Sequence, residues 1–471
     1  MAPNPARLEF VGAGLFALAV LHTFSTRYFE RLAHARAAHA GLWHLLGEVE
    51  TVFGFWALLL VLYMTLAQGW SATADYLDDR RFVEPMFVFA IMVVAASRPI
   101  MQVASDSVRA LGTLLPARRA IAGYFLSLSA VPLLGSLITE PAAMTLAALM
   151  LRDRAFGPGA SRRLKYATLG VLFVNVSVGG TLTNFAAPPV LMVAAKWGWS
   201  SAYMLSEFGA KAAFAVLLNA LVLTLAFRRE LLAVANREHA QAAPRVPATF
   251  VAANLGLLAL IVLTNHHPEA FMGLFLVFLG LAEAYRRHHD RLMLREGLMV
   301  AFFLAGLVTL GGMQRWWLQD VLSQLDESTL YFGATALTAI TDNAALTYLG
   351  SLVDGVSVDY KYALAAGAVT GGGLTVIANA PNPAGFALLK DRFDDRSIGA
   401  LGLFLAALPP TLVAIVCFRG IRGPVGEFFD LELWSDWLSG LDRSFLFLLI
   451  LPFVVGAVGL WAELSGRDRE R

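Results

Sequence analysis

The chain has 471 residues, of which 58% are hydrophobic and 15% charged, and its formal net charge is +1. Soluble globular proteins carry about 25% charged residues, so this composition excludes an ordinary soluble domain and indicates a chain built for lipid. The single cysteine, Cys417, excludes an intramolecular disulfide framework and any cysteine-rich metal site. No nucleic-acid partner is expected.

Long uncharged runs indicate membrane-spanning helices. The runs 51–69, 246–268, 397–418 and 444–462 approach or exceed the roughly 18 residues that a spanning helix needs. We therefore predict an all-α polytopic membrane protein. Its spanning helices, about eleven in number, are expected near 8–25, 45–68, 84–104, 166–196, 206–227, 248–265, 270–285, 297–314, 362–389, 397–418 and 444–462.

Two further apolar runs, 120–151 and 329–353, each carry one carboxylate, Glu140 or Asp342. Cytoplasmic segments of membrane proteins collect Lys and Arg. If each run enters and leaves the membrane on one side, 25 Lys and Arg fall in the cytoplasmic segments and 10 on the other side. Both runs are therefore predicted to be re-entrant hairpins, one from each side. This arrangement places the N-terminus outside and the C-terminus in the cytoplasm.

The predicted elements form an inverted-topology repeat, in which three helices, a hairpin, a broken helix and a further helix occur twice. Residues 1–227 form the first repeat and residues 248–418 the second. Such repeats are typical of transporters, whose binding site lies near the bilayer midplane where discontinuous helices meet. The first repeat contains a hairpin at 120–151 and a broken helix at 166–196, and the second contains a hairpin at 329–353 and a broken helix at 362–389. A cytoplasmic linker at 228–247 joins the repeats. An interfacial segment with an extra C-terminal transmembrane helix occupies 419–471.

Glu140 and Asp342 are the leading candidates for chemistry. Glu140 lies in the sequence Ile-Thr-Glu-Pro-Ala-Ala and Asp342 in Ile-Thr-Asp-Asn-Ala-Ala. A carboxylate at membrane depth is costly and usually faces a polar cavity, where it can hold a proton or a cation. The alternative is a structural role, in which each carboxylate caps the second arm of its hairpin, because a helix N-terminus favours an anion.

The two broken helices supply neutral oxygens beside glycine-rich breaks at 178–184 and 371–375. Unwound backbone at membrane depth is tolerated only where it is buried in protein or lines a cavity. Carbonyl, amide and hydroxyl oxygens there are hard ligands suited to Na⁺. The alternative is a helix kink without any ligand role. The candidates are Thr181, Thr183 and Asn184 in the first break, Thr375, Asn379 and Asn382 in the second, and Thr139 and Thr341 beside the two carboxylates.

Other polar residues of the predicted helices are interpreted as structural. Glu48 and Glu50 begin the second helix and are expected at the cytoplasmic interface. Asn175 and Ser177 are interpreted as polar residues that pack helices together, as such residues commonly do in membranes.

Paired hairpins, each followed by a helix broken at a Gly-Gly-x-Leu-Thr type motif, resemble the ion transporter superfamily. This superfamily includes dicarboxylate/sodium symporters, arsenite pumps and sodium/proton antiporters. The segment Thr338–Leu352 is similar to the antiporter hairpin tip, and the broken helix around 376–383 is similar to the antiporter branch. The resemblance covers nearly the whole chain. It implies that Asp342 and Asn343 bind the ion together with Thr375 and Asn379, and that the protein is a homodimer with an elevator-like motion.

The chain departs from the dicarboxylate branch, which is expected to show Ser-Asn-Thr at both hairpin tips. Neither tip has this sequence, and Glu140 and Asp342 would repel a carboxylate substrate. The resemblance therefore favours the antiporter branch.

The sequence predicts a transporter of the inner (plasma) membrane, not an enzyme, that exchanges protons for Na⁺ or Li⁺. Both carboxylates would bind cation and proton competitively, with no cofactor beyond the transported ions. If only one carboxylate binds the ion, we expect it to be Asp342. The nearest alternative is a Na⁺- or H⁺-coupled transporter of an anion or metalloid in the same fold. An uncoupled channel or scaffold is a further alternative. An intramembrane aspartyl hydrolase is disfavoured because the chain lacks Gly-x-Gly-Asp and Tyr-Asp motifs.

Overall fold

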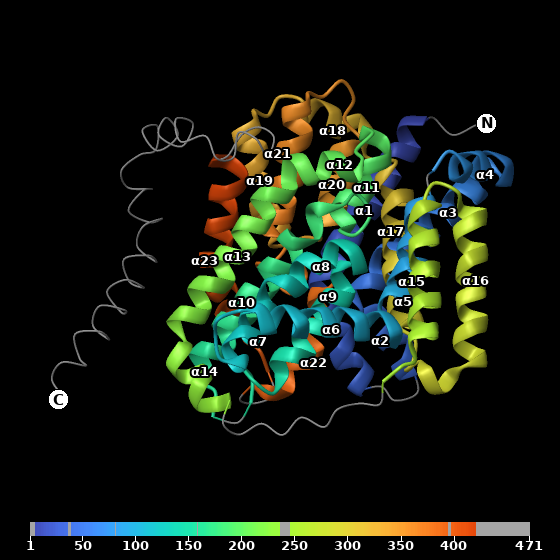
Figure 1. The fold of residues 1–471 in the computed structure, drawn as a ribbon. Helices are drawn as coiled ribbons and strands as arrows, with labels where there is room; N and C mark the ends of the chain where they lie inside the picture. Colours follow the sequence, from blue (N-terminus) through green and yellow to red (C-terminus); the bar gives the residue numbers. More distant parts are fainter. Residues whose placement is uncertain are drawn as a thin grey trace, which may run out of the picture.

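The computed structural model describes residues 5–35, 39–80, 82–157, 159–235, 245–393 and 397–420, and every regular element within them is a helix (Figure 1). The all-α prediction is confirmed. The first half contains α1 (Pro5–Ala35), α2 (Ala40–Gly47), α3 (Val49–Gln68), α4 (Trp70–Asp78), α5 (Val83–Ala95), α6 (Arg98–Leu114), α7 (Arg119–Leu128), α8 (Ala130–Ile138), α9 (Glu140–Arg152), α10 (Arg162–Gly179), η2 (Gly180–Leu182), α11 (Pro188–Trp197), α12 (Ser201–Met204), the π-helical η3 (Leu205–Gly209), α13 (Ala210–Ala226) and α14 (Arg228–Ala235).

The second half also consists of helices joined by short connections. It contains α15 (Ala248–Leu263), α16 (Pro268–Ala284), η4 (Arg286–His288), α17 (Leu294–Gly311), α18 (Arg315–Leu322), α19 (Glu327–Thr338), α20 (Asn343–Ser351), α21 (Val358–Gly371), α22 (Asn382–Leu389), η5 (Lys390–Arg392) and α23 (Ala400–Gly420). The interfacial segment and C-terminal helix predicted for 419–471 lie almost wholly outside the described residues.

Helix length and composition support a multi-pass membrane protein. In the part of the chain that the structure describes, five helices are long and apolar enough to cross a membrane, and the number rises to seven if each of two bent helix pairs is one span. The predicted total of about eleven is not reached on this measure, because most helices around the hairpins and breaks are individually shorter than a roughly 20-residue span. The five helical stretches are 7–26, 50–68, 201–226, 294–311 and 400–420.

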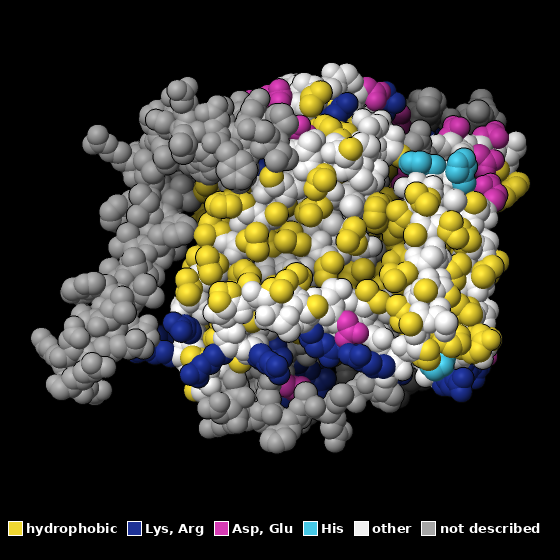
Figure 2. Space-filling view, in the orientation of Figure 1, with side chains coloured by type: hydrophobic (Ala, Val, Ile, Leu, Met, Phe, Trp, Pro, Cys, Tyr) yellow, Lys and Arg dark blue, Asp and Glu magenta, His cyan; other side chains and the backbone are white. Residues whose placement is uncertain are grey.

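The surface carries the charge pattern of a membrane protein. On the face shown in Figure 2, hydrophobic side chains form a band across the middle, Lys and Arg gather along the lower edge, and Asp and Glu gather towards the upper edge. In the same orientation, α2, α14 and α22 lie towards the lower, basic edge (Figure 1). Basic residues collect on the cytoplasmic side of membrane proteins, so this segregation of charge is an observation from which an orientation in the membrane can be proposed.

The prediction of one continuous helix over 84–104 is wrong. This segment belongs to α5 and α6, which are bent by 65° relative to each other. Pro99 lies in the first turn of α6, where its missing N–H needs no partner. The polar side chains of Gln102, Asp106 and Arg109 recur at helical spacing on α6. Such amphipathic helices are favoured at a membrane surface rather than across it, which accounts for the bend.

The predicted hairpin regions both contain helix pairs separated by a turn at the carboxylate. In 120–151, α7 and α8 are bent by 43°, and α9 follows directly after Thr139. In 329–353, α19 ends at Thr338 and α20 begins at Asn343. The re-entrant path of these regions and the inverted relation of the two halves stay predictions.

The bend between α7 and α8 is stabilised by a buried amide network. Pro132 has no N–H, so it leaves the carbonyl of Leu128 without its helical donor. The Nδ2 of Asn175 donates to this carbonyl at 2.7 Å and to the Val216 carbonyl at 3.1 Å. Asn219 Nδ2 in turn donates to Asn175 Oδ1 at 3.0 Å. Asn175 therefore joins helices, in agreement with its interpretation from sequence.

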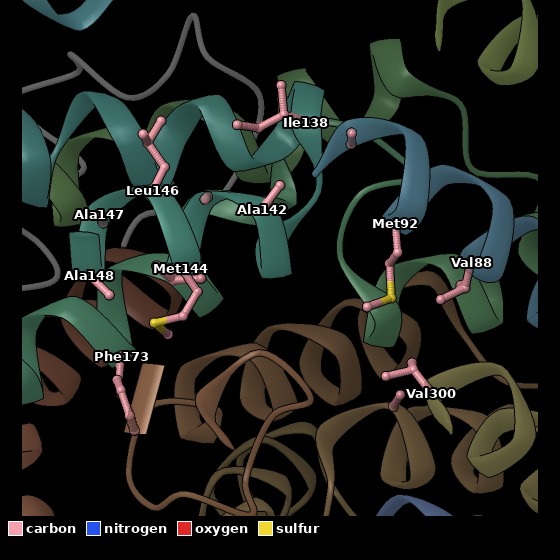
Figure 3. Packing of buried hydrophobic residues seen from close by; sticks show 14 of the residues in the cluster. Val88, Met92, Ile138, Ala142, Met144, Leu146, Ala147, Ala148, Phe173 and Val300 are labelled. Carbon is pink, nitrogen blue, oxygen red and sulfur yellow. The ribbon is translucent and has the colours of Figure 1, made fainter. Parts of the chain in front are cut away.

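The broken segments of the two halves cross each other. The second arm α9 packs against α22, and α20 packs against α11, so each hairpin contacts the broken helix of the other half. Gly385 of α22 allows this contact, because a Cβ there would lie 2.5 Å from Met144 Sδ and 3.1 Å from Phe173 Cε1. Figure 3 shows Met144 and Phe173 together in the apolar packing around α9. Consequently the two carboxylate-bearing turns lie in one interior region.

Candidate functional site

The turn between α8 and α9, in the first predicted hairpin, contains a strained residue. Thr139 has φ 73° and ψ 151°, and it is the only non-glycine residue with positive φ in the described part of the chain. This region is normally reserved for glycine and costs of order 1–3 kcal/mol for other residues, and such strain concentrates at functional sites. Thr139 is buried, and its Oγ1 has no hydrogen-bond partner among the described residues.

Glu140 is fully buried in the first turn of α9. Its Oε2 accepts a hydrogen bond of 2.7 Å from Nδ2 of Asn379, which lies in the break before α22. Its Oε1 has no partner among the described residues, and a Cβ added to Gly180 would lie 2.4 Å from this oxygen. The side chain therefore points to the two glycine-rich breaks and does not cap its own helix.

Asp342 is the N-cap of α20. Its Oδ1 accepts hydrogen bonds from the N–H groups of Ala344 at 2.8 Å and Ala345 at 3.1 Å. The capping role considered from sequence is thus confirmed for Asp342. The same carboxylate also lines a cavity, so capping does not exclude an ion-binding role.

This cavity has a volume of about 420 Å³ and brings together three carboxylates and one amide. The polar residues that line it include Glu48, Glu50, Asp342 and Asn379, and the rest of its wall is mainly apolar. Asn379 connects the two hairpins, because it bonds Glu140 and lines the cavity that contains Asp342.

Buried polar atoms without partners concentrate around these turns. Asn343 donates its backbone N–H to the Ala378 carbonyl at 3.0 Å, while both polar atoms of its buried side chain are unpartnered among the described residues. A buried polar atom without a partner costs about 1–3 kcal/mol. A cation or a proton-carrying group would offset this cost. The unpartnered oxygens at the turns and breaks are Thr139 Oγ1, Glu140 Oε1, Thr338 Oγ1, Asn343 Oδ1, Asn379 Oδ1 and Asn382 Oδ1.

Most candidate hydroxyls instead bind the backbone. Thr183 Oγ1 donates to the Ser136 carbonyl at 2.6 Å, and Thr375 Oγ1 donates to the Ala339 carbonyl at 2.8 Å. Each break is thus tied to the hairpin of its own half. Thr181 donates to the Val178 carbonyl and Thr341 to the Leu337 carbonyl, each within its own segment.

The two remaining amides take different positions. Asn382 Nδ2 donates to the carbonyls of Gly372 and Thr375, each at 2.8 Å, and so holds the second break together. Asn184 Nδ2 donates to the Trp199 carbonyl at 2.8 Å, and its Oδ1 accepts from Ser201 Oγ at 2.8 Å. These hydrogen bonds of Asn184 join the first break to the segment at the start of α12 rather than to either carboxylate.

Ser136 holds the first break against its hairpin, and its loss is expected to destabilise the protein. Its hydroxyl donates to the Gly179 carbonyl at 2.7 Å and accepts from the Leu182 N–H at 2.9 Å. Ser136→Ala would leave both groups unpaired, at about 1–3 kcal/mol for each buried group. Thermal unfolding in detergent should show a clear decrease in melting temperature. Ser25→Ala, which removes an exposed hydroxyl bonded to the Leu21 carbonyl, should leave the melting temperature nearly unchanged; equal melting of both variants would contradict the prediction.

Glu48 and Glu50 are residues that sequence reasoning missed. The sequence predicts both at the cytoplasmic interface, yet both line the cavity of Asp342. For Glu50 the available signal is its position in the first turn of α3, directly before the uncharged run 51–69. Local sequence does not reveal which residues share its cavity.

The chain has membrane-length helices, two interrupted helices, and carboxylates at the turns between helix pairs, of which Glu140 is buried and Asp342 half-buried. Together these features define a multi-pass membrane transporter. A family model described as "Putative Na+/H+ antiporter" matches residues 7–421, and the chain belongs to this family. The resemblance to sodium/proton antiporters is thereby confirmed, and the family implies a transporter rather than an enzyme. A search of the curated proteins found no match.

Proposed function

We propose that the protein exchanges protons for Na⁺ or Li⁺ across the inner (plasma) membrane. The observation that supports this proposal most directly is that one residue, Asn379, is associated with both carboxylates. Its Nδ2 donates to Glu140 Oε2, and the residue lines the cavity that Asp342 also lines. One transported ion could therefore act on both hairpins.

The exchange follows from the cost of buried charge. An ionised carboxylate away from water needs a proton or a cation as partner. Na⁺ and Li⁺ prefer hard oxygen ligands, and such oxygens are present as Asp342, Glu140, Asn343 Oδ1 and Asn379 Oδ1. A cation can bind only when a carboxyl group has released its proton, so the two ions compete for one site and their movements are coupled. Several candidates would then shape the site mainly by holding the turns and breaks through their hydrogen bonds: Thr341, Thr181, Thr183, Thr375, Asn184 and Asn382. Thr139 would do so through its backbone, at the strained turn.

The charge segregation supports a topology. Cytoplasmic segments collect basic residues, so we assign the basic edge of Figure 2 to the cytoplasm. We propose on this basis that the N-terminus lies outside. A cytoplasmic C-terminus is proposed from the sequence prediction of an extra helix at 444–462, which lies outside the described residues. The cavity includes Gly47 at the end of α2 and Phe386 of α22, helices that lie towards the basic edge, so it would face the cytoplasm. A homodimer with an elevator-like motion, as the family resemblance implies, is part of the proposal.

A pH-gradient assay in proteoliposomes tests the function. A pulse of Na⁺ or Li⁺ is expected to change the internal pH reported by a trapped dye, whereas K⁺ and choline serve as comparison cations. Absence of any cation-evoked pH change in correctly folded, reconstituted protein would refute the antiport proposal. Repeating the assay with the membrane potential clamped distinguishes release of one proton per cation from release of two.

An anion or metalloid cargo has less support. Three carboxylates line the cavity, and they would repel an anion electrostatically. A labelled anion that is taken up in the same liposomes would favour that alternative.

A further inference from the structure

We infer that Glu50 is a further cation-binding residue, which holds the transported ion opposite Asp342; this inference rests on the proposed exchange function. Glu50 comes from the first turn of α3 and Asp342 from the N-cap of α20, and both line the same cavity. Two ionised carboxylates that line one cavity repel each other. A cation placed between them would be attracted by both.

Glu50 differs from its neighbour Glu48 in one decisive respect. Glu48 Oε1 is paired with Arg295 of α17. Glu50 forms no ion pair with any residue in the described ranges, although the charge of Arg295 acts on it at longer range. The negative charge of Glu48 is therefore already compensated by the protein. That of Glu50 requires a proton or a cation from the cavity.

An independent feature of the same wall points to a ligand. Asn379 is 1% exposed and lines the cavity, and its Oδ1 has no hydrogen-bond partner among the described residues. Two carboxylates and this amide oxygen form a set of hard ligands typical of an alkali cation. The volume of about 420 Å³ far exceeds the roughly 30 Å³ of one water molecule, so the cation can keep part of its hydration shell.

The charged groups around this position are few. Glu48 with Arg295 lies on the α2–α3 side, and Glu140 lies behind Asn379. Glu140 is fully buried whereas Glu50 is half-buried, so Glu140 is further inside the protein than Glu50. We therefore place Glu50 at the outer part of the exchange site, where it raises the affinity for the cation rather than carrying the exchange itself.

The test is the Na⁺ dependence of proton movement at low ionic strength in Glu50→Gln. We expect KM for Na⁺ to rise about tenfold, which corresponds to the loss of about 1.4 kcal/mol of binding free energy, with a maximal rate near that of the natural protein. Glu50→Asp should recover part of the affinity. Glu269→Gln is the matched control: Glu269 also lies in the first turn of an apolar helix, α16, but is exposed and outside the cavity.

The outcomes separate the two proposals. If the natural protein exchanges ions and Glu50→Gln has the same KM for Na⁺, the role of Glu50 is refuted while the antiport function stands. If the natural protein shows no Na⁺-evoked pH change, the function itself fails. Should Glu50→Gln be inactive in transport, binding of ²²Na⁺ to the purified variant decides: about tenfold weaker binding supports the inference, and unchanged binding overturns it.

Discussion

Replacing Asp342 by asparagine is expected to reduce the Na⁺-evoked pH change to the level of protein-free liposomes, with little change in stability. Asparagine caps helices about as well as aspartate, so it can still accept the N–H groups of Ala344 and Ala345 that hold α20. It cannot release a proton or supply negative charge to a cation. The substitution therefore removes the proposed chemistry and keeps the local fold. Proton movement and thermal unfolding of the same preparation measure the two effects.

A matched control exists for this substitution. Asp326 caps α19 in the same way, because its Oδ1 accepts from the N–H groups of Ser328 and Thr329. The hydrogen bond from the Thr329 hydroxyl, together with those from the two N–H groups, holds the pKa of Asp326 below its usual range. Asp326 does not line the cavity of Asp342. Asp326→Asn should exchange ions normally. If Asp342→Asn also exchanges ions at the full rate, Asp342 is not part of the mechanism.

Gly373→Ala is expected to disrupt the crossing of the two broken helices. A Cβ at this position would lie 2.4 Å from both Cα and N of Val174 in α10. Cβ contacts below 3.0 Å are essentially never observed, and backbone atoms inside a helix cannot move aside as a flexible side chain can. The break or α10 must therefore shift. Overpacking of this kind costs about 1–3 kcal/mol and occasionally more, and we expect the upper end of that range. Because the break leads to Asn379, ion exchange should decrease as well.

The melting temperature in detergent checks this expectation. Gly333→Ala makes the same chemical change in α19, where nothing lies within 4 Å of the added Cβ. Alanine is favoured over glycine inside a helix by about 1 kcal/mol, so Gly333→Ala should leave the melting temperature unchanged or slightly raised. If both variants melt at the same temperature, the close approach of Gly373 to Val174 does not limit packing.

Much of the candidate site could be located from the sequence. The breaks before α11 and α22 occur where glycine and proline cluster, because these residues act on the backbone within a few positions. Asp342 was identified as a carboxylate in an apolar run, and its capping role followed from the helix that begins beside it. The bend between α5 and α6 was missed, because the polar face of α6 was counted as part of a hydrophobic span.

The sequence by itself determined the helical membrane class, the positions of the two breaks and the two carboxylates placed in apolar runs, since each depends on local composition and backbone preference. Only the tertiary structure decided which groups meet. Asn379 bonds Glu140 although the two residues are 239 positions apart, and Glu50 lines the same cavity as Asp342 although it belongs to a different helix. Such pairings result from the packing of whole helices, because α9 lies against α22 and α20 lies beside α17. No local pattern encodes them, and for that reason the two glutamates of the cavity, Glu48 and Glu50, were assigned to it only from the fold.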